Sequence, residues 1–420
     1  MKKLSIVVCC LFALAACAPG MKDLPKLQSK LSTADVKIRM KAVQKMGQIT
    51  GATPEVLPIL YGVLKTDSNS GVRAVAAKSL QNLGFTEAQT PLQVALKDDK
   101  SPEVRSAAAE SLYGLAGFNA LESLTQGTSD LNAEVRAVCV KYVGEIGGER
   151  ASKTIRGKLK NDTSPIVRTQ AVSALGQMKD VQGFELVKDA IINDTSLSVK
   201  KAAVVAIGNY SGEDSMNVLC TALKDTVLQD AAIESIHENN RSADSKEAIT
   251  LLMAAFDADP EKIKDDRIID IFIQCNDMRV KPYYRKYILY PWSDRGKFEG
   301  IVKILKRNGD TTMVPQLISD LRGVRKSSRI INIVTALGHF QDRRATPVLL
   351  SMIRNRSQYK SHVPSHLFWA LDVIGDPSSA GYLCHLCCKD TDKDTRRDAC
   401  EVLFHNQNEL DWPKQKCNCK

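Results

Sequence analysis

The chain has 420 residues, of which 44% are hydrophobic and 25% are charged, and its formal net charge is +10. This composition excludes a globally disordered chain, and the length excludes a single compact core, which stops growing at roughly 250–300 residues. The positive charge is uneven, because residues 17–280 carry a net charge of −2 and residues 281–420 carry +10.

The first 16 residues have the pattern of a signal peptide. Two lysines precede an apolar run over residues 4–16, which is too short to span a bilayer. The run ends in Leu-Ala-Ala before Cys17, and this sequence resembles the lipobox of bacterial lipoproteins. The resemblance implies a covalent lipid on Cys17 and a tether over residues 17–23, in the bacterial cell envelope. The alternative is an ordinary secretory signal in which the cysteine is incidental.

The residue after the lipobox cysteine bears on the destination. In many enteric-type bacteria an aspartate there retains a lipoprotein in the inner membrane, whereas this chain has Ala18. By this resemblance we expect the periplasmic face of the outer membrane.

A short phrase recurs about every 32 residues between residues 24 and 245. It consists of an aspartate, a valine five residues later, a basic residue directly after the valine, and then small apolar residues ending near a glycine. A fixed period of this length is typical of stacked helical repeats. The phrases pair Asp67 with Arg73, Asp99 with Arg105, Asp130 with Arg136, Asp162 with Arg168, and Asp194 with Lys200.

Each unit holds two apolar patterns with helical spacing, as in residues 92–95 and 104–112. Two helices per repeat, with Val-Arg opening the second, resemble HEAT repeats, and in particular the short type found in bacterial proteins and phycobilin lyases. The resemblance implies an all-α fold, a right-handed superhelical solenoid of roughly 11–12 helix pairs.

The phrase has a structural interpretation. The aspartate lies in the turn between helices, where a carboxylate accepts backbone N–H bonds, and the basic residue can reach an acid in its own or the adjacent turn. The alternative is that the charged ladder binds an anion or a metal. The phrase weakens after residue 226 and returns at Asp390 and Arg396. We therefore expect degenerate, basic repeats over residues 246–411 and a cysteine-containing tail over 412–420.

Bases and aromatic residues interleave in the segment that begins at residue 279. Such mixing suits an anionic, partly apolar ligand, so residues 279–330 are a candidate surface for a glycan or an anionic lipid. The alternative is that the aromatic side chains fill the core while the charges face water. The candidate residues are Arg279, Lys281, Tyr283, Tyr284, Arg285, Lys286, Tyr287, Tyr290 and Trp292.

Six cysteines crowd the end of the chain. An envelope protein faces an oxidising compartment, so disulfides are the favoured interpretation; thiols and a metal site are the alternatives. The spacing matches no specific zinc motif, and six cysteines leave the connectivity undecided. They are Cys384, Cys387, Cys388, Cys400, Cys417 and Cys419.

The sequence favours binding over catalysis. Deoxyhypusine hydroxylases use several His-Glu pairs on repeat helices to hold two irons, and this chain has the single pair His237-Glu238. It contains no phosphate-binding loop, nucleophile elbow or zinc-protease helix. We expect a non-catalytic scaffold with no cofactor except the lipid, binding a protein and no nucleic acid. The alternatives are the glycan or lipid binder and, third, a metal or redox protein using the terminal cysteines.

Overall fold

The computed structural model describes residues 21–49, 55–239, 246–259, 265–275, 277–291, 293–360, 362–409 and 417. Across these residues the regular elements are α-helices and short 3-10 helices, without strands, so the fold is an all-α solenoid. None of the described helices has the length and hydropathy that a bilayer span requires. The predicted signal peptide, Cys17, Trp292, Cys419 and most of the predicted tail lie outside the described residues.

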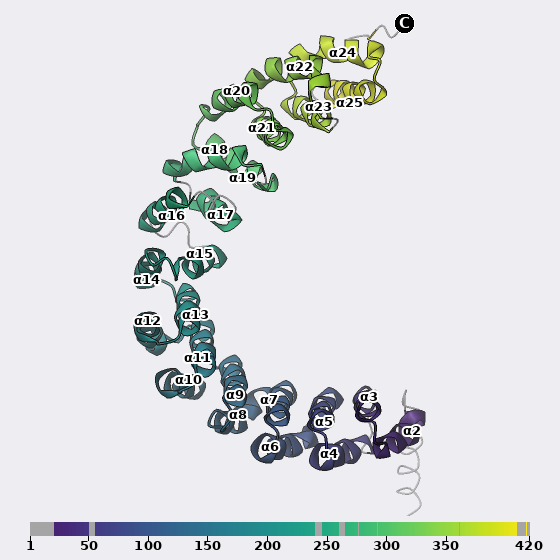
Figure 1. Cartoon of the computed structure of the whole chain (residues 1–420), viewed down its shortest axis with the longest axis vertical. Coiled ribbons are helices and arrows are strands. Elements are labelled where there is room, and N and C mark those ends of the chain that lie inside the picture. The colour runs from purple at the N-terminus through teal and green to yellow at the C-terminus, as the bar shows by residue number, and fades with distance from the viewer. Residues whose placement is uncertain are drawn as a thin grey trace, which may run out of the picture. The chain divides into compact units, whose positions relative to one another are not determined.

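The chain divides into two compact units, Met1–Ala222 and Leu223–Lys420. Both are built from pairs of helices, labelled in Figure 1, and we call the first, even-numbered helix of each pair A and the second, odd-numbered helix B. The helices of the first unit are α2 (Leu24–Ser29), α3 (Val36–Met46), α4 (Val56–Thr66), α5 (Ser70–Leu83), α6 (Gln89–Asp98), α7 (Pro102–Ala116), α8 (Leu121–Gly127), α9 (Ala133–Ile146), α10 (Glu149–Asn161), α11 (Pro165–Met178), α12 (Phe184–Asn193), α13 (Leu197–Gly208) and α14 (Glu213–Leu223), which reaches the boundary.

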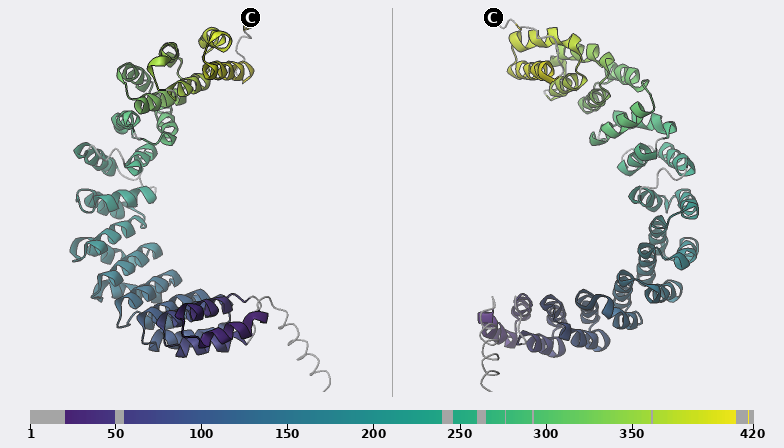
Figure 2. Two further views of the ribbon diagram at one scale, coloured as in Figure 1. Left: turned by 45° about the vertical axis from the view of Figure 1, so that its right-hand side comes forward. Right: turned by 180° about the vertical axis from the view of Figure 1, so that it is seen from behind.

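The first unit has two layers. Its B helices pack in succession from α3 to α13, and its A helices from α4 to α12 form the second layer (Figures 1 and 2). The valine of the phrase makes this packing possible, since it is fully buried in every repeat from Val72 to Val199. Burial of such a side chain stabilises the fold by about 1.5–3 kcal/mol. Each copy of the phrase therefore contributes one equivalent buried valine to the core.

Local signals set the ends of the helices. Asn69 and Asn132 cap α5 and α9 by accepting backbone N–H bonds through their side chains. Gly84 follows α5 with a φ of +72°, a conformation that favours glycine. Within α9, Gly144 faces Ala174 of α11, and a Cβ at Gly144 would lie 2.6 Å from the Ala174 Cβ. The B helices therefore approach closely where the sequence supplies small residues.

The second unit keeps the paired helices, but the phrase is lost until it returns at Asp390 and Arg396. Its B helices again pack in succession from α15 to α25. Its helices are α15 (Gln229–Glu238), α16 (Lys246–Ala258), α17 (Asp266–Cys275), α18 (Lys281–Leu289), α19 (Gly296–Arg307), α20 (Met313–Gly323), α21 (Ser327–Phe340), α22 (Thr346–Arg354), α23 (Val363–Ile374), α24 (Ala380–Lys389) and α25 (Lys393–Glu409).

Candidate interaction surface

A ladder of ion pairs runs along the first unit. The four arginines of the phrase in this unit, and Arg39 at the equivalent position of α3, donate through Nε and Nη2 to both carboxylate oxygens of the aspartate in the following repeat, at 2.7–3.0 Å. This two-pronged geometry is the strongest form of an arginine–carboxylate pair. The pairs join Arg39 to Asp67, Arg73 to Asp99, Arg105 to Asp130, Arg136 to Asp162 and Arg168 to Asp194.

Each ladder arginine also binds its own repeat. The Nη1 atom of Arg73 donates to the carbonyl oxygen of Asp67 at 2.9 Å, and Arg105 reaches Asp99 in the same way at 2.8 Å. Lys200 has a single ammonium group and cannot form the two-pronged contact of a guanidinium. Its Nζ donates to the carbonyl of Ile192 at 2.8 Å. The arginines therefore link consecutive repeats, and the lysine stays within one.

The ladder carboxylates are saturated with donors. Asp99 accepts from Arg73 and from the backbone N–H of Ser101 at 2.8 Å, and its side chain is only 10% exposed. Burial acts to raise the pKa of Asp99, but these hydrogen bonds outweigh it, so the pKa lies below the ordinary value. The ladder charges are therefore paired with each other within the first unit, which favours the structural interpretation of the phrase.

A groove crosses the B helices α3, α5, α7 and α9, and its volume is about 580 Å³. Val75, Ala107 and Val138 stand two residues after successive ladder arginines, so the same face of each helix is turned to the groove. At one end, Tyr142 stacks on Tyr113 with ring centroids 4.7 Å apart. The floor of the groove is thus apolar and built from equivalent positions of consecutive repeats.

Charged side chains line the rim of this groove. Lys78 pairs with Glu110 at 3.4 Å, and Lys141 lies 5.0 Å from the centre of the Tyr142 ring. Two further acids, Glu103 and Glu134, line the groove and are exposed; Glu103 accepts a hydrogen bond from the Ser70 hydroxyl at 3.1 Å, and neither acid forms an ion pair within the described residues. The rim therefore holds two uncompensated carboxylates, which suit basic groups on a binding partner.

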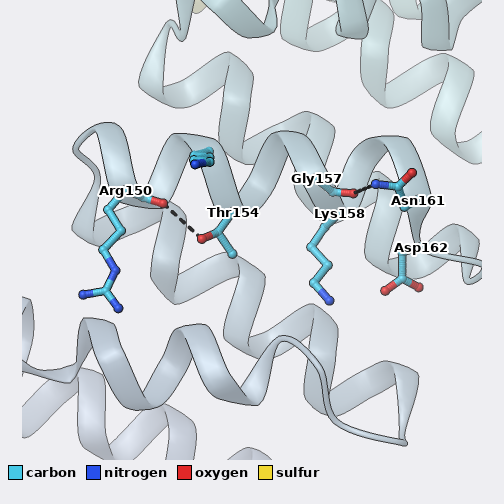
Figure 3. A pocket seen from close by; sticks show the side chains of 7 residues that line it. Arg150, Thr154, Gly157, Lys158, Asn161 and Asp162 are labelled. Atoms are coloured by element: carbon cyan, nitrogen blue, oxygen red, sulfur yellow. Dashed lines mark hydrogen bonds between the residues drawn. The ribbon is translucent and has the colours of Figure 1, made fainter.

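A second hollow lies on the A helix α10 (Figure 3). It exists because Gly157 has no side chain and no atom lies within 4 Å of where its Cβ would be. Arg150 at one end pairs with Glu122, and Asp162 at the other belongs to the ladder. Burial lowers the pKa of Lys158 between them. This hollow is a gap along one helix whose charged ends already have protein partners.

Comparison with known families identifies the repeats. The family profile described as HEAT repeats matches residues 11–81, 63–127 and 121–197. The first unit therefore contains HEAT repeats. No curated protein sequence matches it.

Solved structures of HEAT-like proteins resemble parts of the chain. The complex of CpcE and CpcF of phycocyanin lyase from Nostoc sp. PCC7120 is 20% identical over 55% of this chain and 92% of that chain, with a TM-score of 0.32. Human deoxyhypusine hydroxylase is 17% identical over 55% and 88%, with a TM-score of 0.26. YibA of E. coli is 19% identical over 74% and 97%, with a TM-score of 0.41.

The tyrosines of the candidate basic and aromatic surface lie in the core of the second unit. Tyr283, Tyr284 and Tyr287 are at most 5% exposed. The Tyr284 hydroxyl donates to the carbonyl of Phe272 at 2.5 Å, and Tyr287 donates to Asp266 at 2.6 Å. These three residues therefore fill the core between irregular helix pairs instead of forming a surface.

The bases of the same segment have acidic partners nearby. Arg279 pairs with Asp277, Lys281 with Asp310, Arg285 with Asp320, and Lys286 with Asp257, all at 2.5–2.9 Å. Tyr290 is half-buried, and its carbonyl accepts from Asn332 at 2.7 Å. The positive charge of the four bases is therefore largely compensated by acids of the same unit. A charge count along the sequence could not reveal this pairing.

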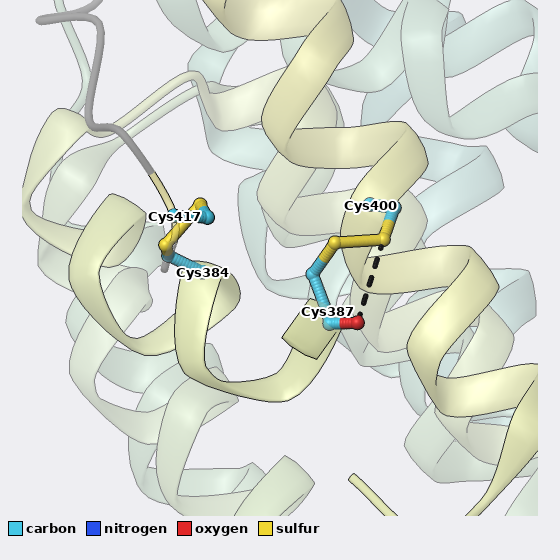
Figure 4. The surroundings of a disulfide bond; sticks show 4 residues. All are labelled: Cys384, Cys387, Cys400 and Cys417. Carbon is cyan, nitrogen blue, oxygen red and sulfur yellow. Dashed lines mark hydrogen bonds between the residues drawn. A yellow bond between two sulfur atoms is a disulfide. The ribbon is translucent and has the colours of Figure 1, made fainter. Parts of the chain in front are cut away.

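The last helix pair, α24 and α25, carries disulfides (Figure 4). Cys387 of α24 is bonded to Cys400 of α25, and Cys384 is bonded to Cys417; Cys388 is disulfide-bonded as well. The sulfur atoms of Cys384, Cys388 and Cys417 lie within 4.8 Å of one another. In this oxidised state they are not thiolates, the form that binds zinc.

A local ladder closes the same repeat. Asp390 accepts two bonds from Arg356, at 2.6 and 2.7 Å, and Arg396 donates to the carbonyl of Asp390 at 2.6 Å. Arg396 therefore binds its own repeat as the ladder arginines do. The partner of the carboxylate, Arg356, lies outside the Val-Arg position.

The sequence already placed Lys78, Glu110 and Lys141 in one surface column, five residues after successive ladder arginines, but the two further acids of the groove were not singled out. These two uncompensated acids stand two residues before the ladder arginines, Glu103 before Arg105 and Glu134 before Arg136. The repeat period contained the information needed to find these acids. B-helix residues at the same distance from the ladder arginine in each repeat lie on the same face of the B layer. Reading each offset as a column along the repeats could have found them.

Proposed function

We propose that this protein is a lipid-anchored, non-catalytic HEAT-repeat scaffold of the bacterial cell envelope, and that its groove across α3, α5, α7 and α9 binds another protein. The observation that carries the proposal is the apolar floor of Val75, Ala107 and Val138 beneath a rim with two uncompensated carboxylates. A partner with basic and apolar side chains fits this groove. Elsewhere in the unit the ladder charges are satisfied by each other, which supports binding over chemistry.

The groove is tested by photo-crosslinking in the native cell. A photoreactive residue at Val75 is expected to give one discrete adduct. The same residue at Lys97, exposed on the A helix α6, is the matched control and should give none. Glu134→Lys is expected to reduce the Val75 adduct strongly, whereas Glu87→Lys, outside the groove, should not. Equal adducts from positions 75 and 97 would contradict the proposal.

The anchor rests on the lipobox resemblance around Cys17 and is tested separately. A Cys17→Ser variant is expected to move from the membrane fraction to the soluble fraction, because without lipid the chain loses its strong hold on the bilayer. Continued partition of this variant with membranes would refute lipidation as the cause. For a protein on the periplasmic face, the outer-membrane fraction is the expected location.

A further inference from the structure

A second depression lies on the B-helix face of the second unit, and we call it the Trp369 notch. Its lining residues are Arg295, Thr335, Ser365, His366 and Trp369, and its volume is about 360 Å³. They come from the start of α19, from α21 and from α23, which are successive B helices. Like the groove of the first unit, the notch is formed across neighbouring repeats.

A buried amide holds Arg295 in place. The Nε–H of Arg295 donates to Oδ1 of Asn332 at 2.8 Å, and Asn332 is fully buried. The Nδ2 of Asn332 donates in turn to the carbonyl of Tyr290 at 2.7 Å and to the Ser293 hydroxyl at 3.0 Å. A buried amide is tolerated when its polar atoms are bonded, and here those bonds fix the orientation of the guanidinium.

Among the described residues, Arg295 uses only one of its side-chain donors. A guanidinium has five N–H donors, and the contacts of the described residues account for one of them, at Nε. Arg295 is exposed and forms no ion pair among these residues, in contrast to Arg285 with Asp320. The guanidinium at the notch therefore keeps its charge and both Nη groups for a ligand, an arrangement suited to a carboxylate.

The indole of Trp369 supplies a fixed apolar wall. Its ring is backed by Gly338, where a Cβ would lie 2.5 Å from Cζ3 of Trp369. His339 meets the ring edge-on, with ring centroids 5.5 Å apart. The tryptophan is nevertheless 38% exposed. A glycine behind it and an exposed side in front leave one surface of the notch flat and apolar, which suits an aromatic group.

Two polar side chains complete the notch. Thr335 is 8% exposed, and its hydroxyl has no hydrogen-bond partner among the described residues. A buried hydroxyl without a partner is costly. His366 donates from Nδ1 to the carbonyl of His362 at 2.9 Å, which leaves Nε2 for another contact. The notch thus combines an apolar wall, an unpaired cation and unused hydrogen-bonding capacity.

We propose that the Trp369 notch binds a carboxylate next to an aromatic group, presented by an acidic and an aromatic residue on a partner protein. The aromatic group stacks against the Trp369 indole, and the carboxylate accepts from the two Nη groups of Arg295. This inference rests on the proposed scaffold function and names the chemistry of a second contact. The groove of the first unit suits basic groups, and the notch selects acidic ones.

The probe is N-acetylphenylalanine, which carries one carboxylate and one aromatic ring, added to the full-length protein. With 5-fluorotryptophan labelling, the resonance of Trp369 among the three tryptophans is assigned by Trp369→Phe. We expect a saturable shift of this resonance at millimolar ligand. N-acetylphenylalanine amide, acetate and inorganic phosphate should each bind at least tenfold more weakly. Equal binding of the amide would reject the carboxylate contact, equal binding of acetate or phosphate would reject the aromatic contact, and no saturable shift would reject the notch as a site.

Three variants sharpen the test. Arg295→Gln is expected to weaken binding roughly tenfold or more, because a charged hydrogen bond is lost. Ser365→Glu places a negative charge at the rim without touching Asn332 and should weaken binding in the same direction. Arg322→Gln, on the exposed face of α20, is the matched control and should leave binding unchanged. Unaltered affinity in both notch variants would overturn the proposal.

The crosslinking experiment separates this inference from the scaffold function. If the notch does not bind, the Val75 adduct persists while the Trp369 resonance fails to respond. If the scaffold function is wrong, the adduct is absent whether or not the small carboxylate binds.

Discussion

The two units use the same helix pairs but stabilise them differently. In the first unit five arginine–aspartate pairs repeat with one geometry, and every ladder side chain is at most 14% exposed. In the second unit the pairs have varied partners and exposures, as for Arg285 at 42%, while buried tyrosines and disulfides hold the helices together. The same helix pairs can therefore stack without an identical arginine–aspartate pair in every repeat. Four experiments test this difference between the units, beginning with the largest expected effect.

Acid should weaken the first unit through its ladder. The pKa values of all five ladder aspartates are lowered. For Asp194 the hydrogen bond from Arg168 is the main cause; for the other four, burial is the largest single influence and raises the pKa, but the hydrogen bonds from the arginine and from a backbone N–H, with the nearby positive charge, together outweigh it. The unfolded chain then binds more protons than the folded chain, so stability is present above about pH 4 and is lost as pH falls through the folded pKa values. Hydrogen exchange at several pH values, corrected for the intrinsic rate, reports each unit separately. Equal protection of α5 to α11 at pH 7 and pH 3 would contradict this.

Removing one ladder carboxylate should cost more than removing an equivalent acid in the second unit. Asp99→Ala leaves the guanidinium of Arg73, whose side chain is 4% exposed, without its partner, and we expect a loss of about 3–5 kcal/mol. The matched Asp320→Ala exposes an already accessible Arg285 and should cost about 1 kcal/mol or less. Urea denaturation compares the two variants. Similar losses would mean that the ladder is no stronger than ordinary surface pairs.

Reduction should act on the second unit alone. The bond between Cys387 and Cys400 spans 13 residues, and closing a loop of this size stabilises a fold by about 3 kcal/mol. Burial raises the pKa of the Cys139 thiol in the first unit to about 12, so this thiol is unreactive. A Cys387→Ala, Cys400→Ala double variant should show faster hydrogen exchange in α24 and α25, with α5 to α11 unchanged. Loss of protection in the first unit would contradict this.

Close helix approach gives the smallest expected effect. Gly144→Ala forces a Cβ against Ala174 and should destabilise the first unit by about 1–3 kcal/mol. Gly157→Ala on α10 meets nothing within 4 Å and should be neutral or stabilising by up to about 1 kcal/mol. Gly338→Ala in the second unit displaces the Trp369 ring, so Trp369 fluorescence should change more than stability does. Thermal melts and fluorescence distinguish the three variants.

Much of the first unit could be predicted from its sequence, because one phrase serves both the core and the turns. The spacing from Val72 to Val199 gave the period, and the predicted arginines Arg73, Arg105, Arg136 and Arg168 take part in the ladder. Lys200 and Arg396, which the same pattern included, bind backbone carbonyls of their own repeat. Which acid each arginine reaches depends on the rise from one repeat to the next, and the sequence left both possibilities open. The structure resolves this in favour of the following repeat.

The second unit was harder to predict because its tyrosines are amphipathic. Tyr284 has an apolar ring and a polar hydroxyl, so its sequence context fits a surface or a core equally well. The deciding contact, the carbonyl of Phe272, lies in the preceding B helix. The notch depends in the same way on Asn332, a residue 37 positions away from Arg295. No local pattern marks such a pair.

The ladder also gives the first unit a direction. Every ladder arginine binds the aspartate of the repeat that follows it. Truncating the chain after any complete repeat of the ladder would therefore leave an unpaired guanidinium at the new C-terminal face. A cut before a repeat would instead leave an unpaired aspartate at the new N-terminal face. The two ends of a shortened array are therefore chemically opposite, and two such fragments could join head to tail through the same fork that joins neighbouring repeats.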